Sequence, residues 1–77
     1  MEHAYLLINC DQNKDDEVLK KLGLLDEIKQ AVKVIGAFDI IAKINAKNQN
    51  ELEQIMIPAL KKIKEIRGIK TLTGGKE

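Results

Sequence analysis

The residues best suited to binding chemistry are Gly36 and Asp39, which stand close together in the segment 34–44, VIGAFDIIAKI. Gly36 tolerates a positive φ and, having no side chain, leaves nearby backbone N–H groups open to a visiting molecule. Asp39 adds a carboxylate beside that backbone. A carboxylate accepts hydrogen bonds from an ammonium, and N–H groups donate to a carboxylate, so the pair suits a small zwitterion. A turn glycine followed by a surface acid is the alternative interpretation.

The other reactive side chains form no recognisable catalytic or metal-binding group. His3 is the only histidine and Cys10 the only cysteine, and they would meet only by chance proximity across a strand. A single cysteine excludes an internal disulfide and a thiolate pair for a metal. Asp15, Asp16 and Glu17 are adjacent at a predicted helix start, where they complement the helix dipole. We therefore expect neither an enzyme nor a bound cofactor or metal.

Length and composition narrow the class of protein. The 77 residues suffice for one small core, so we expect a single domain over residues 1–77. The net charge is only +1 and the sole aromatic residues are Tyr5 and Phe38, which disfavours direct nucleic-acid binding. The apolar run 4–8 is too short for a signal peptide or a membrane span. With one cysteine, a cytoplasmic protein is expected.

Hydrophobic periodicity and turn residues predict six elements. Strands are expected over residues 4–10, 28–35, 38–46 and 68–73, and helices over 14–22 and from 48 to about 63.

Particular residues are expected to shape the two helices. Asn13 or Asp11 is predicted to cap the first helix, and Asn48 followed by Glu51 resembles a capping box that opens the second. Pro58 is expected to kink the second helix. The apolar stripe of that helix comprises Leu52, Ile55, Met56, Ala59, Leu60 and Ile63.

The two middle strands are expected to form a tight antiparallel hairpin, because only Gly36 and Ala37 separate them. Alternation places Ile28 and Val32 on one face of the earlier strand, with Ala31 on the other. In the later strand, Ile40, Ala42 and Ile44 are expected to share one face.

The element order β-α-β-β-α-β is the ferredoxin-like pattern, an α+β fold with a four-stranded antiparallel sheet and both helices on one face. The opposite sheet face would then be bare. Because the strands carry apolar residues on both sides, we expect a second copy to cover that face, giving a homodimer.

Two short motifs in this order resemble the effector-binding (RAM) C-terminal domain of the Lrp/AsnC family of transcription regulators. The likeness spans residues 4–73, nearly the whole chain. It rests on the glycine, aromatic and aspartate of the hairpin and on a G-(V/I)-x-x-x-T ending, that is, on Gly36, Phe38, Asp39, Gly68, Ile69, Thr71 and Thr73.

The resemblance implies a module that dimerises through its sheets as a dimeric α/β barrel, with dimers joining into octamers or similar rings. It implies an amino acid or related small molecule bound between dimers. The ligand-binding residues carried over are Gly36, Ala37, Phe38, Asp39, Thr71 and Thr73.

Two departures from the family pattern are visible. No residues here could build the family's helix-turn-helix, so we expect a stand-alone regulatory module that cooperates with full-length Lrp/AsnC regulators and does not itself bind DNA. The chain turns to Gly74 and Gly75 after the last strand, which shortens an edge that helps form rings.

Two other functions stay open. The same fold hosts small dimeric α/β-barrel enzymes, for which His3, Tyr5, Asn9 and Asp39 are the available polar groups. An ACT-like amino-acid sensor that acts on a partner enzyme would share the fold and the class of ligand.

Overall fold

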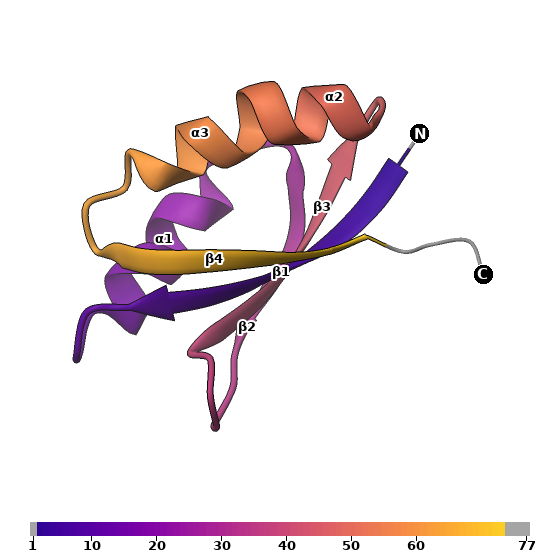
Figure 1. The fold of residues 1–77 in the computed structure, drawn as a ribbon. Helices are drawn as coiled ribbons and strands as arrows, with labels where there is room; N and C mark the ends of the chain where they lie inside the picture. Colours follow the sequence, from indigo (N-terminus) through magenta and orange to yellow (C-terminus); the bar gives the residue numbers. More distant parts are fainter. Residues whose placement is uncertain (1, 74–77) are drawn as a thin grey trace.

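The computed structural model of the protein describes residues 2–73 (Figure 1). The predicted break at Gly74 and Gly75 lies outside these residues. The elements in chain order are β1 (Glu2–Cys10), α1 (Asp15–Gly23), β2 (Ile28–Lys33), β3 (Ile40–Ala46), α2 (Gln49–Glu51), the π-helical turn η1 (Leu52–Met56), α3 (Ile57–Lys61) and β4 (Ile66–Thr73).

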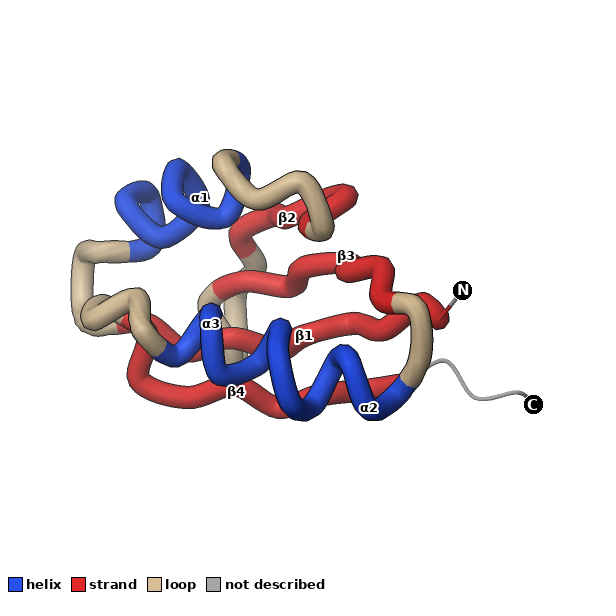
Figure 2. The backbone as a smooth tube through the Cα atoms, turned by 90° about the horizontal axis from the view of Figure 1, so that it is seen from above, coloured by secondary structure: helices blue, strands red, loops and turns tan. Residues whose placement is uncertain are grey.

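The four strands form one antiparallel sheet in the order β2-β3-β1-β4. All helical segments cover the same face: α1 lies on the β2 side, and the run α2–η1–α3 crosses toward the β4 side (Figures 1 and 2). The predicted ferredoxin-like α+β fold is therefore confirmed. None of the helices within residues 2–73 is long and apolar enough to cross a membrane.

The core lies between the sheet and the helices. Alternate residues of β1 and β3, among them Leu6, Ile8 and Ile44, are fully buried. Val18 and Leu22 of α1 cover one part of the core, and Leu52 and Leu60 of the second helical run, α2–η1–α3, cover another. Each large side chain buried in this way contributes about 1.5–3 kcal/mol of transfer free energy. The alternation predicted for the β3 strand is confirmed.

The other face of the sheet carries no helix, as predicted (Figure 1). Its side chains are partly apolar: Tyr5 and Val32 are each 44% exposed and Leu72 is 48% exposed. Tyr5 lies opposite Leu72 in the β1–β4 ladder, so these two apolar side chains are neighbours. The face is suited to association with another protein surface.

The predicted antiparallel pairing of β2 and β3 is confirmed, but the two-residue connection predicted between them is wrong. The last β2–β3 pair is Lys33 with Ile40, so six residues, 34–39, connect the strands. Asp39 ties this connection to β1 and joins its two ends, because its N–H donates to the Ile8 carbonyl oxygen of β1 at 2.9 Å and its carbonyl oxygen accepts from the Val34 N–H at 2.9 Å. The chain is thus already engaged with β1 before β3 begins. Gly36 adopts φ +135°, which suits glycine alone.

The predicted alternation of β2 is also wrong. Ile28 pairs with Ile44 and Ala31 pairs with Ala42, so β2 carries one residue more than β3 between these pairs. This irregularity is a β-bulge, which turns two residues three positions apart toward the same face. Ile28 and Ala31 therefore both pack against the core.

The helix starts follow the predictions only in part. Lys14 is the N-cap of α1 and makes no side-chain capping bond, so the predicted cap at Asn13 or Asp11 is wrong. Asn13 instead takes the left-handed conformation, with φ 65°. At α2 the cap is confirmed, because Asn48 Oδ1 accepts from the Glu51 N–H at 2.8 Å.

Pro58 is accommodated by a wider turn. Ahead of it, the Ile57 N–H bonds to the Leu52 carbonyl oxygen, five residues back, which defines the π-helical turn η1. The additional residue shifts the buried side of the helix. Ile55 is consequently 60% exposed and Ala59 is exposed, whereas both were predicted to belong to the buried stripe.

Candidate functional site

Asp39 is held more firmly than any other residue of the predicted site. Besides its two backbone hydrogen bonds, its Oδ2 accepts from the Cys10 N–H at 2.8 Å. The carboxylate is half-buried at the end of β1, and its second oxygen has no hydrogen-bond partner within the described chain. Cys10 lies 29 residues away in sequence, so no local pattern could have revealed this partner.

The rest of the hairpin tip faces outward. Gly36 and Ala37 are exposed, and Phe38 is half-buried. A Cβ built on Gly36 would meet no atom within 4 Å, so the backbone there is open to solvent. Ile35 is fully exposed beside it, although it is a large apolar residue. An exposed backbone at Gly36 and a hydrogen-bonded carboxylate at Asp39 thus lie in the same hairpin.

The threonines of the predicted site lie across the sheet from the hairpin. Thr71 pairs with Leu6, and Thr73 pairs with Ala4, both in β1. Since β1 separates β4 from β3, the chain does not enclose the hairpin and these threonines in one cavity. The six-residue ligand site therefore stays a prediction.

The surroundings of the Cys10 thiol disfavour its reactive thiolate form. Its burial, followed by the carboxylates of Asp39, Asp15 and Asp11, raises its pKa to about 11. His3 stands near the opposite end of β1, where its Nδ1 lies 2.6 Å from Asn45 Oδ1. The two residues therefore form no catalytic pair. Among residues 2–73 there is also no group of three His, Cys, Asp or Glu side chains that could hold a metal.

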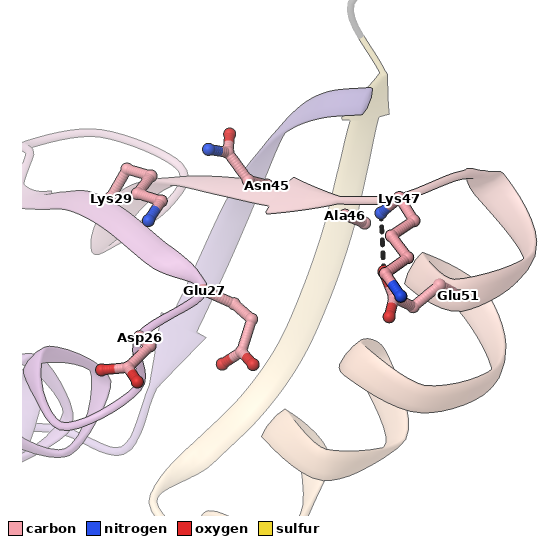
Figure 3. A pocket seen from close by; sticks show the side chains of 7 residues that line it. All are labelled: Asp26, Glu27, Lys29, Asn45, Ala46, Lys47 and Glu51. Carbon is pink, nitrogen blue, oxygen red and sulfur yellow. Dashed lines mark hydrogen bonds between the residues drawn. The ribbon is translucent and has the colours of Figure 1, made fainter. Parts of the chain in front are cut away.

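A charged pocket lies at the end of the sheet far from the hairpin (Figure 3). Its volume is about 290 Å³, and it is lined by Asp26, Glu27, Lys29, Asn45, Ala46, Lys47 and Glu51. Asp26 and Glu27 stand on one side, with Lys47 and Glu51 on the other (Figure 3).

Backbone and side-chain hydrogen bonds fix the frame of this pocket. The Asn45 N–H donates to the Glu27 carbonyl oxygen at 3.0 Å, and the Lys47 N–H donates to Glu51 Oε1 at 2.6 Å. Sequence reasoning missed the pocket because its residues come from three separate segments. The only local signal was the capping residue Glu51.

Comparison with known proteins finds relatives over nearly the whole chain. The protein-family model described as "Lrp/AsnC ligand binding domain" matches residues 3–73. Among solved structures, FFRP-DM1 is similar with a TM-score of 0.90 and 29% identity, covering 97% of this chain and 100% of that chain. Escherichia coli AsnC is similar with a TM-score of 0.88 and 26% identity, over 99% of this chain and 52% of that one.

The chain is also similar to part of an enzyme. A homocitrate synthase from Saccharolobus islandicus is 34% identical over 71 residues, which are 91% of this chain but 15% of the enzyme. The chain thus spans a small part of the curated relatives that it matches.

Proposed function

Because the chain belongs to the Lrp/AsnC ligand binding domain family, whose members are small-molecule-binding regulatory modules, we propose that it binds an α-amino acid at the β2–β3 hairpin and acts as a regulatory module. The observation that supports the proposal most directly is the fixed carboxylate of Asp39 beside the open backbone of Gly36.

The geometry gives each part of a zwitterion a partner. One carboxylate oxygen of Asp39 is taken by the Cys10 N–H, which leaves the other to accept from an ammonium. The backbone around Gly36 can donate to a carboxylate. Thr71 and Thr73 would come from a neighbouring copy, because β1 keeps them away from the hairpin of their own chain.

The proposed assembly also rests on membership of this family. We propose a homodimer in which the open sheet faces of two copies pack together, covering Tyr5, Val32 and Leu72. Dimers would then join into an octamer or a similar ring around the hairpins. A full-length Lrp/AsnC regulator is the first proposed partner, and the cytoplasm is the proposed compartment.

A sensor that acts on a partner enzyme is the second candidate. The observation that favours it is the homocitrate synthase in which a similar segment makes up 15% of the length. Co-elution with a purified helix-turn-helix regulator would support the first partner, and co-elution with a purified homocitrate synthase would support the second.

The test of the ligand site is a thermal-shift screen of the twenty amino acids on wild-type protein and on Asp39→Asn. Asparagine keeps an oxygen for the Cys10 N–H but removes the charge that an ammonium needs. A ligand at 100 times its Kd adds about 2.7 kcal/mol of stability, so the midpoint should rise by about 10 °C or more in a domain of this size.

Glu53→Gln, an exposed carboxylate outside the hairpin, is the matched control. The proposal requires the ligand-induced shift to vanish in Asp39→Asn and to persist in the control. An unchanged shift in Asp39→Asn would remove the hairpin from the site.

A further inference from the structure

A second candidate site lies within a single chain, in a groove made of the charged pocket and an adjoining apolar cavity, whose walls are the α1–β2 connection, β3 and the second helical run. The inner part of this groove is a cavity of about 150 Å³ lined by Leu25, Glu27, Ile28, Ile44, Ile55, Met56, Ala59 and Leu60. Glu27 lines both this apolar cavity and the charged pocket. The two cavities therefore meet at its side chain.

The two cavities lie next to each other, because residues close together in the same elements line them. Along β3, Ala46 lines the charged pocket and Ile44, two residues earlier on the same buried face, lines the apolar cavity. Along the second helical run, Glu51 lines the first and Ile55 lines the second. The lining thus changes from charged to apolar along each of the three elements: the α1–β2 connection, β3 and the second helical run.

The apolar end has the size of a small hydrocarbon group. A cavity of about 150 Å³ lined by Leu, Ile and Phe is large enough to hold benzene. Here the walls are leucine, isoleucine, methionine and alanine, and Ile55 stands 60% exposed at the site. An exposed isoleucine beside an apolar cavity favours an apolar occupant.

The charged pocket contains carboxylates and ammonium groups, most of which make no ion pair with each other. Asp26 and Glu27 make no side-chain hydrogen bond or ion pair within residues 2–73, and neither do the ammonium groups of Lys29 and Lys47. Glu51 is the exception, since it accepts from a backbone N–H. A ligand ammonium would meet the two carboxylates, and a ligand carboxylate would meet the two lysines.

We propose that this groove binds a zwitterionic α-amino acid with an aliphatic or phenyl side chain, with its charged groups in the pocket of Figure 3 and its side chain in the apolar cavity. The site is separate from the hairpin and does not depend on it. It also needs no second copy of the chain.

The test is a titration of isotope-labelled protein with L-leucine, L-methionine and L-phenylalanine, followed by NMR chemical shifts. The proposal predicts saturating shifts at Ile44, Met56 and Ala59. Glycine lacks the side chain, isoamylamine lacks the carboxylate and isocaproate lacks the ammonium, so each should bind at least about tenfold more weakly. Shifts that map to the hairpin alone would overturn the groove and leave the proposed function standing.

Variants separate the two sites. Ala59→Leu fills the apolar cavity from an exposed helix position, and Gln54→Leu adds the same side chain at an exposed position that does not line the groove. Binding in the groove should weaken by about tenfold or more in Ala59→Leu and persist in both Gln54→Leu and Asp39→Asn. If Asp39→Asn abolishes the groove shifts, or if Ala59→Leu leaves them unchanged, the inference is wrong. Shifts produced equally by isoamylamine alone would also contradict it.

Discussion

The hydrogen bond between Asp39 and Cys10 makes a quantitative prediction about folding. In Asp39→Ala the half-buried Cys10 N–H loses its partner at 2.8 Å. Removing one partner of a buried hydrogen bond costs about 1–3 kcal/mol, because the remaining group is left unsatisfied. We expect Asp39→Ala to lose about that much free energy of unfolding. Asp39→Asn retains an acceptor and should lose about 1 kcal/mol or less.

Urea unfolding monitored by circular dichroism measures both changes, and hydrogen exchange locates them. In Asp39→Ala the Cys10 amide should exchange faster than in the wild type, while the Leu6 amide in the middle of β1 serves as the internal reference. A drop of about 4–8 °C in Tm per kcal/mol is expected for a domain of this size. If Asp39→Ala unfolds with the wild-type free energy and unchanged exchange at Cys10, the carboxylate does not anchor the hairpin.

Two further predictions concern titrating groups. Burial and then the carboxylate of Asp39 raise the pKa of Cys10, so Asp39→Asn should lower that pKa from about 11. The Cys10 thiol of the folded variant should then be alkylated faster than that of the wild type at a given alkaline pH. An unchanged pH–rate profile of alkylation would contradict this. Glu65 is buried with an oxygen 2.8 Å from Lys21 Nζ, and this hydrogen bond lowers the pKa of the carboxyl from its ordinary value. A lowered folded-state pKa stabilises the fold above the unfolded-state value and loses that effect as the pH falls through the folded-state value. Wild-type stability should therefore decline more steeply below about pH 4.5 than that of Glu65→Gln, and parallel acid-unfolding curves would refute the role of Lys21.

The element order and the ferredoxin-like fold could be predicted because they depend on local signals. Alternating apolar residues identify β3, and Asn48 with its oxygen on the Glu51 N–H marks a helix start. Such patterns involve residues within a few positions of one another. They report periodicity and caps without requiring knowledge of the rest of the chain.

What could not be predicted depends on contacts between distant segments. The six-residue connection between β2 and β3 is held against β1 by the bonds of Asp39 to Ile8 and Cys10, which are far away in the sequence. The bulge in β2 arises from its pairing with β3, and the lost periodicity around Ile55 follows from the π-helical turn before Pro58. For the same reason no sequence pattern indicated the groove, whose walls come from the α1–β2 connection, β3 and the second helical run.

The open sheet face provides the prediction that separates assembly from ligand binding. Tyr5 lies in the β1 ladder between Lys43 of β3 and Leu72 of β4. Tyr5→Lys would place two ammonium groups side by side on the surface proposed to pack against an identical one, where like charges oppose association.

Sedimentation at a fixed protein concentration should then show a monomer where the wild type is a dimer or a ring. Leu24→Lys makes the same change in charge at a residue that is 82% exposed beyond the end of α1, and it should leave assembly intact. Because the hairpin site needs a second copy and the groove does not, the monomeric Tyr5→Lys protein should lose amino-acid binding at Asp39 while retaining it at Ala59. A Tyr5→Lys protein that sediments as the wild type does would show that the copies meet through another surface.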